Sequence, residues 1–210
     1  YRDVFDQNVY YEGTQYLHLE RLYRDLFGKR RRATNVNVFD EVPDSLFFTN
    51  RHGRERLSEG ELKRGPAKED RISSGGKWTI TKGKFTGITP GFFAKNELGE
   101  RFVLKFDPMD FPEAATGAEV VASRFLHAMG YNVPEYHLLY LQKDQFEIAP
   151  GARVYDESGF QKDLTPERLE EFLLFAPEAK EETYRISASR ILEGEILGPM
   201  KFQGRRKDDP

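Results

Sequence analysis

Residues 102–130 read FVLKFDPMDFPEAATGAEVVASRFLHAMG, and the rest of the chain can be arranged around this stretch. The first five residues are apolar apart from Lys105, and Asp107-Pro108 follows them. A short apolar run that is rich in β-forming residues and closes at a proline predicts a buried strand. A lysine inside such a strand is costly unless its ammonium group meets an anionic partner.

The residues after this strand predict a helix that would supply the partner. Pro112 suits a first helical turn, an alanine-rich run follows, and Gly130 is a typical C-terminal stop. Glu119 lies at the edge of the apolar stripe of this helix, so we expect it to reach back to Lys105. The alternative is that Lys105 extends to solvent and Glu119 is a solvated helix residue. The apolar stripe, which we expect to be buried, consists of Ala118, Val121, Phe125, Ala128 and Met129.

Length and composition restrict the class of protein. A chain of 210 residues can form one domain or two small ones. Charged residues make up 32% but the net charge is only -3, so no global basic field favours nucleic acid or an anionic membrane. The absence of cysteine excludes disulfides and thiolate metal sites, and the four histidines are too dispersed for a metal site. No apolar run approaches the roughly 20 residues of a transmembrane helix.

The two ends of the chain lead us to expect a fragment of a longer protein. The chain opens at Tyr1 without a signal-peptide pattern, and residues 201–210 resemble a cut linker toward a further lobe. The compartment stays undecided between cytoplasmic and exported after removal of a leader. Residues 1–75 predict an N-terminal extension wrapped on the main body, with an amphipathic helix ending at Gly28 and a short helix capped by Ser58.

Residues 76–200 predict one α+β lobe, an antiparallel sheet of five strands with one main packed helix. We expect the strands at residues 78–80, 92–95, 101–106, 137–141 and 184–192, with 146–148 extending a hairpin. Thr165 and Pro166 are a typical N-cap and first helical residue. They predict a helical insertion near residues 164–180 that interrupts the sheet.

The segment between the first two strands is rich in glycine and lysine. Gly83, Gly87 and Gly91 would let backbone amides approach phosphate oxygens. Lys82 and Lys84 would add positive charge to the same segment. A plain hairpin connection is the alternative interpretation of these residues.

The order of these elements resembles the N-terminal lobe of protein-kinase-like folds, in which a strand lysine is paired with a helix glutamate. The helix end AMGYNVP at residues 128–134 is similar to the HipA-like and phosphatidylinositol-kinase-like branch. The stretches NVNVFDEVPD at 35–44 and FVLKFDP at 102–108 are similar to a family of bacterial hypothetical proteins of that type. The resemblance covers about residues 76–200, whereas residues 1–75 resemble no kinase element.

The resemblance implies a nucleotide site that binds ATP. It assigns to Lys105 the contact with the phosphates, to Glu119 the role of holding Lys105, and to residues 82–91 the loop that covers the phosphates. It also implies a hinge at 191–194 whose backbone would hydrogen-bond adenine. The hinge residues that it assigns to the cofactor are Leu192, Glu193 and Gly194.

The chain departs from the kinase pattern in two respects. The loop lacks strict Gly-x-Gly-x-x-Gly spacing, and neither a catalytic-loop Asp with a downstream Asn nor a metal-binding Asp-Phe-Gly follows the hinge. Phosphoryl transfer needs metal ions and a base. We therefore expect that this chain alone does not catalyse, and that Mg²⁺ binds only with the missing C-terminal lobe. The phosphate acceptor is not specified.

Two other classes of function stay open. The first is a pseudokinase or interaction module that keeps the fold and binds a partner through its aromatic N-terminal segment. The second is a small β-rich binding domain unrelated to kinases, in which Lys105 points to solvent. A Lys105 ammonium within salt-bridge distance of Glu119 would argue against this last class.

Overall fold

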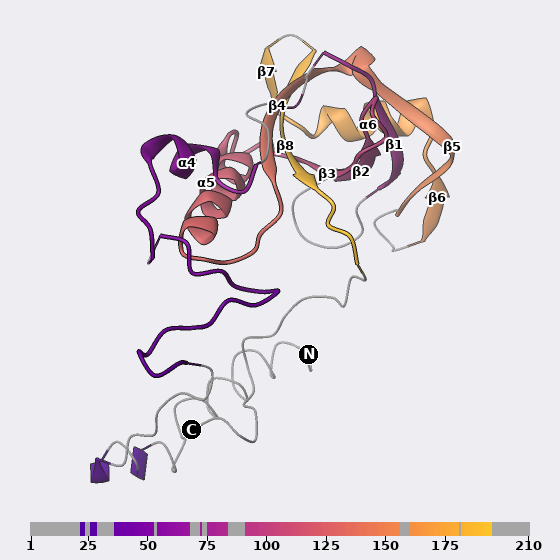
Figure 1. Cartoon of the computed structure of the whole chain (residues 1–210). Coiled ribbons are helices and arrows are strands. Elements are labelled where there is room, and N and C mark those ends of the chain that lie inside the picture. Colours follow the sequence, from indigo (N-terminus) through magenta and orange to yellow (C-terminus); the bar gives the residue numbers. More distant parts are fainter. Residues whose placement is uncertain are drawn as a thin grey trace. The chain divides into compact units, whose positions relative to one another are not determined.

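The computed structural model describes residues 22–23, 26–28, 36–52, 54–67, 72, 75–83, 91–155, 160–180 and 182–194. The contacts divide the chain into two compact units. One unit is Asp44–Glu193, and the other combines Tyr1–Pro43 with Gly194–Pro210. The larger unit therefore includes residues 44–75, which the sequence assigns to the N-terminal extension, and it contains the strands and longer helices of Figure 1.

The larger unit is an α+β structure. Its helices are α4 (Glu59–Arg64), α5 (Ala114–Ala128) and α6 (Pro166–Leu174). Its strands are β1 (Trp78–Gly83), β2 (Gly91–Lys95), β3 (Arg101–Phe106), β4 (Tyr136–Gln142), β5 (Phe146–Tyr155), β6 (Gln161–Asp163), β7 (Glu178–Lys180) and β8 (Thr183–Arg190). The short helix that the sequence predicts after Ser58 is present with both hydrogen bonds of a capping box, and Thr165 caps α6 as expected.

The five expected strands lie in one sheet and run antiparallel to their neighbours in the order β4-β8-β3-β2-β1. The prediction of a five-stranded antiparallel sheet is nevertheless wrong, because the sheet has eight strands and is mixed. Residues 146–155 pair in parallel with β1 instead of forming a hairpin with β4. Strand β6 continues the sheet beyond β5, and β7 pairs with β8.

A short link explains why the sheet curls. Strands β4 and β5 are far apart in the strand order, yet only the 3-10 turn Lys143–Gln145 joins them. A link of this length spans only about 14 Å. The sheet must therefore bend so that its first strand approaches β5, and Figure 1 shows this curvature with α6 inside it.

The main core fills the concave face of the sheet. Large side chains from alternate strand positions are buried there, among them Trp78, Phe92, Phe102, Phe106 and Ile186. Helix α6 contributes Leu169 and Leu173 to this core, and the Phe172 ring centroid lies 4.2 Å from that of Phe92. Each such side chain contributes about 1.5–3 kcal/mol when fully buried. The helical insertion thus covers the face of β3 that is opposite to Lys105.

Helix α5 packs on the other face, but not through the expected stripe. Val121, Phe125 and Met129 are 51%, 66% and 57% exposed, so the prediction that they are buried is wrong. The buried residues of α5 are Thr116, Val120 and Ser123. Polar contacts of Thr116 with Asp107 and of Glu119 with Lys105 and Ser187 select this face, and they override the hydrophobic periodicity.

Both ends of α5 are held by residues outside the helix. The helix begins at Ala114, two residues after Pro112, because Glu113 has a left-handed φ of 69°. At the other end Gly130 has a φ of +110°, and a Cβ there would collide with the ring of Phe48. The carbonyl of Gly130 also accepts a 2.7 Å hydrogen bond from the Thr49 backbone, so residues before α4 fix where α5 ends.

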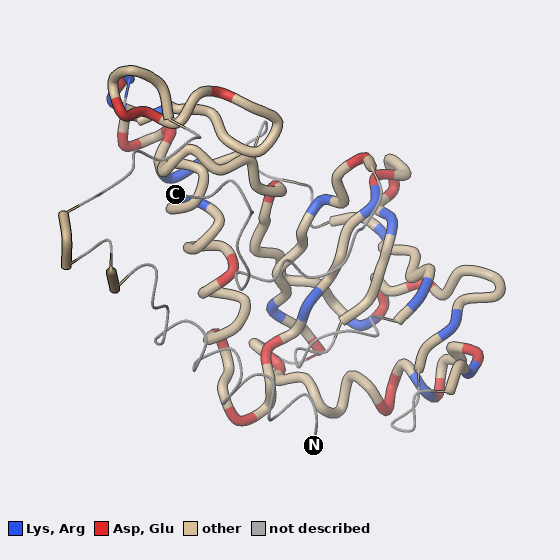
Figure 2. The backbone as a smooth tube through the Cα atoms, turned by 90° about the horizontal axis from the view of Figure 1, so that it is seen from below, with Lys and Arg blue, Asp and Glu red and all other residues tan. Residues whose placement is uncertain are grey.

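Basic and acidic residues are interspersed along the described backbone (Figure 2). This distribution agrees with the small net charge of -3. Among the described residues, no helix has the length and apolar character that crossing a bilayer requires.

Candidate functional site

The expected pair of Lys105 and Glu119 is present. Lys105 lies in β3 near the middle of the sheet, and its ammonium forms an ion pair with Glu119 Oε1 from α5. The two side chains are 20% and 23% exposed, so the pair is largely shielded but still accessible to solvent. This contact argues against an unrelated β-rich domain in which Lys105 points to solvent.

Ser187 completes the pair, a role that the sequence did not predict. Its hydroxyl donates a 2.6 Å hydrogen bond to Glu119 Oε2, the carboxylate oxygen that Lys105 leaves free. Strand β8 places it there, because Ser187 is directly opposite Lys105 in the β3–β8 ladder. Each carboxylate oxygen of Glu119 thus has its own donor, which fixes the carboxylate and, through it, the lysine.

A second polar cluster orients α5 beside this pair. The Asp107 carboxylate, 2% exposed, accepts hydrogen bonds from the Thr116 backbone N–H at 2.8 Å and from the Thr116 hydroxyl at 2.7 Å. Arg185 of β8 donates to Thr116 Oγ1 and lies 3.4 Å from Asp107 Oδ2. Asp107 therefore caps the first turn of α5 from the end of β3. This geometry sets the rotation of α5 that directs Glu119 to Lys105.

An apolar surface lies on the same face as Lys105. Phe93 of β2 and Val103 of β3 are directly opposite each other and are half-buried. The Lys82 ammonium lies 4.5 Å from the centroid of the Phe93 ring, so it interacts with the aromatic face. Phe93 points away from the main core, to which the neighbouring Phe92 and Ala94 belong.

The predicted phosphate-covering loop is described only at its two ends. Lys84 and Gly87 lie outside the described residues. Gly83 and Gly91 each have a packing reason to be glycine, since a Cβ at Gly83 would lie 2.7 Å from a methyl group of Val154 and one at Gly91 would collide with the Leu104 carbonyl. Gly91 is also opposite Lys105, so no side chain stands next to Lys105 at that position.

The predicted hinge follows β8 directly. The Ile191 backbone N–H donates to the Arg101 carbonyl at 2.9 Å, which holds the start of this segment against β3. Leu192 and Glu193 come next and are exposed. Gly194 has a φ of +127° and belongs to the other compact unit, so its position relative to Lys105 is not described.

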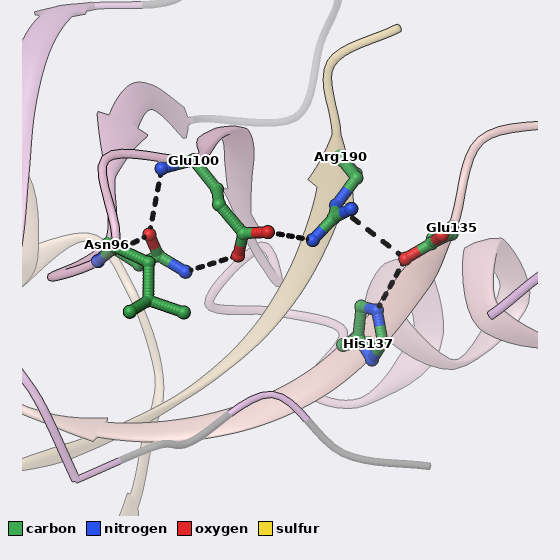
Figure 3. A network of polar contacts seen from close by, with 6 residues as sticks. Asn96, Glu100, Glu135, His137 and Arg190 are labelled. Carbon is green, nitrogen blue, oxygen red and sulfur yellow. Dashed lines mark hydrogen bonds and ion pairs between the residues drawn. The ribbon is translucent and has the colours of Figure 1, made fainter. Parts of the chain in front are cut away.

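A charged network holds the strands together just before the hinge (Figure 3). Arg190, the last residue of β8, donates to Glu100 and lies 3.6 Å from Glu135. Asn96 donates to Glu100 at 2.7 Å, and His137 Nε2 lies 3.6 Å from Glu135. Burial lowers the pKa of His137, although the neighbouring Glu135 raises it. The network fixes the ends of β3, β8 and β4 relative to one another.

The described residues contain no group of three or more His, Cys, Asp or Glu side chains that would hold a metal ion. Comparison of the chain with protein-family models, with curated proteins and with solved structures found no match.

Proposed function

We propose that the unit Asp44–Glu193 is the nucleotide-binding lobe of an atypical kinase-like phosphotransferase, with ATP as its ligand. The observation that carries this proposal is the Lys105–Glu119 pair, held by Ser187 on one face of an antiparallel run of strands. A lysine of the third strand paired with a glutamate of the following helix is the arrangement that protein kinases use for the phosphates.

The geometry suits a phosphate contact at Lys105. Glu119 and Ser187 fix the ammonium without burying it completely, so an incoming phosphate does not have to order a mobile side chain. A unit negative charge about 4 Å from the ammonium would gain about 4 kcal/mol at an effective dielectric constant of 20. Glu119 already neutralises part of this charge, so the net gain is smaller.

The neighbouring surface suits a base. Phe93 and Val103 offer apolar side chains on the Lys105 face, and stacking of a base on an aromatic ring contributes about 1–3 kcal/mol. The backbone groups of Leu192 and Glu193 form no hydrogen bond within the described part of the chain. They would therefore be able to bind the edge of adenine without breaking an existing contact.

Strand β5 and α6 contribute to the core on the concave face of the sheet, opposite to Lys105, whereas the residues of β6 and β7 are exposed. Transfer of a phosphoryl group also requires metal ions and a base. We assign only nucleotide binding to this unit, and the metal ions, the base and the acceptor site to residues outside it.

Isothermal titration of the chain with ATP and Mg²⁺ tests the proposal. Lys105→Met should weaken ATP binding at least about tenfold, or about 1.4 kcal/mol. It should change the weaker binding of adenosine little, since adenosine has no phosphate. Lys95→Met is the matched control, because Lys95 is an exposed lysine at the end of the neighbouring strand. Absence of ATP binding, or equal binding by both lysine variants, would overturn the proposal.

A Lys105→Met variant that does not fold would also fail to bind ATP, so its folding has to be measured separately. Lys105→Met leaves the Glu119 carboxylate without its cation, and an unpaired charge that is largely buried is destabilising. The double variant Lys105→Met with Glu119→Gln removes that charge and keeps an acceptor for the Ser187 hydroxyl. It should be folded by circular dichroism and still fail to bind ATP.

A non-catalytic interaction module, such as a pseudokinase, is the second candidate. The exposed row Val121, Phe125 and Met129 on α5 favours it, because a continuous apolar helix face often marks a partner surface. The same ATP titration discriminates the two candidates, since an interaction module needs no nucleotide.

A further inference from the structure

A basic cavity lies beside one edge of the sheet, apart from the Lys105 site. Its volume is about 520 Å³. Five consecutive residues of β4, 136–140, form one wall, and Lys63, Arg64 and Arg124 from α4 and α5 contribute to the others. None of the described residues that line the cavity carries a carboxylate.

The wall formed by β4 is a strand edge. Strand β4 is the first in the strand order and pairs with β8 alone among the described strands. Every second residue of such a strand directs its N–H and C=O away from the sheet, where they would pair with an added strand. The ladder with β8 runs over seven consecutive pairs without a bulge, so β4 is regular.

This edge lacks the features that normally prevent strand addition. Natural proteins protect exposed edges with lysine, proline or bulges. Residues 136–142 read YHLLYLQ, with neither lysine nor proline, and Leu138 and Tyr140 are 38% and 50% exposed. The five-residue wall is about 17 Å long at the rise of a β-strand, which matches a short extended peptide better than a small ion.

The charges around the edge indicate the character of the peptide. Lys63 forms an ion pair with Glu59, but the side chains of Arg64 and Arg124 form no hydrogen bond or ion pair within the described part of the chain. Guanidinium groups that have no hydrogen-bonded carboxylate among the described residues would attract the carboxylates of a peptide, to which arginine binds through two parallel hydrogen bonds. The described charged residues that line the cavity are all basic, although the chain as a whole is slightly acidic.

We propose that β4 binds an extended acidic peptide as an added strand, with its carboxylates on Arg64, Arg124 and Lys63. The backbone pairing would supply affinity, and the basic side chains would select an acidic sequence. The cavity is lined by other residues than the proposed nucleotide site, so this inference stands independently of it.

Fluorescence anisotropy with a labelled hexapeptide of alternating glutamate and valine tests the proposal. This peptide should bind the chain, and the counterpart with lysine in place of glutamate should not. The double variant Arg64→Glu with Arg124→Glu should weaken binding at least about tenfold, whereas Arg56→Glu, the same change at an exposed residue outside the cavity, should not. Equal binding of the two peptides, no effect of the double variant, or no binding of either peptide would overturn the proposal.

Two further measurements isolate the strand addition. The acidic peptide methylated on every backbone nitrogen can donate no hydrogen bond to the ladder from either of its edges, so it should lose most of its affinity. Hydrogen exchange at residues 136–140 should slow when the unmodified peptide binds. If the methylated peptide binds as tightly as the parent, the peptide does not pair with β4 and the proposal fails.

Discussion

Replacing Asp107 with alanine should destabilise the larger unit by about 3 kcal/mol. The carboxylate caps the first turn of α5 through Thr116, and loss of a helix cap costs about 1 kcal/mol. The substitution also leaves the Arg185 guanidinium, 13% exposed, without its carboxylate. A hydrogen bond to a charged group contributes about 1.5–3 kcal/mol, so we expect a loss in this range from the contact with Arg185. Both contributions involve Thr116, so they are not strictly additive. The value of about 3 kcal/mol lies in the middle of the range that their sum gives.

Urea unfolding followed by circular dichroism measures this loss. The midpoint of thermal unfolding should fall by about 6–12 °C, at about 2–4 °C per kcal/mol for a domain of this size. Asp107→Asn keeps an oxygen acceptor for Thr116 but removes the charge, so it should lose less stability than Asp107→Ala. Asp110→Ala changes an exposed carboxylate in the same loop and serves as the control.

The result for Asp107→Ala bears on the whole account of α5. If this variant loses less than about 1 kcal/mol, Asp107 does not anchor the helix. The explanation of why α5 turns its polar face to the sheet would then be wrong. A loss equal to that of Asp110→Ala would lead to the same conclusion.

Three other substitutions test separate parts of the structure. Burial holds the pKa of His137 below its ordinary value of about 6.5, so the unfolded chain binds the proton at a higher pH than the folded chain does. The free energy of unfolding should therefore fall as the pH drops below about 6.5. His137→Gln should remove part of this fall, measured by urea unfolding at pH 7 and pH 5. Gly130→Ala should destabilise by more than about 1 kcal/mol, because of its positive φ and the collision with Phe48, and Phe48→Ala should relieve part of the loss measured by thermal unfolding. Ser187→Ala should cost about 1.5–3 kcal/mol, since it removes a hydrogen bond to the charged Glu119; an unchanged urea midpoint would contradict the described site.

The pairing of Lys105 with Glu119 could be predicted because it depends on local order. The strand, the Pro112 turn and the helix follow one another directly, and a lysine in a buried strand needs an anion. Ser187 could not be predicted in the same way. Its place depends on the register of two strands that are 82 residues apart, and nothing in the alternating pattern around it fixes that register.

The orientation of α5 was predicted wrongly for a related reason. Hydrophobic periodicity favours burial of Val121, Phe125 and Met129. The pattern of apolar residues contains no information on the position of Asp107 relative to the helix. The buried capping bond places the opposite face of α5 on the sheet.

The topology of β5 could not be foreseen from a short apolar run. The apolar pattern of residues 146–148 fits a hairpin with β4 and a pairing with another strand equally well. Periodicity therefore does not distinguish between these two pairings. The parallel pairing with β1 depends on the curl of the whole sheet, which is a property of many strands together.

Covalent labelling would identify directly which lysine lies at the phosphates. An acyl phosphate of ATP carries an activated carboxyl group on its terminal phosphate, and a lysine nitrogen that lies nearby forms an amide with this group as ATP leaves. Peptide mapping by mass spectrometry would then locate the labelled lysine. We predict that Lys105 is acylated and that excess ATP suppresses the label, while the exposed Lys95 is unaffected by ATP. If Lys105 is not labelled, or its label persists unchanged in excess ATP, the assignment of the nucleotide site is contradicted.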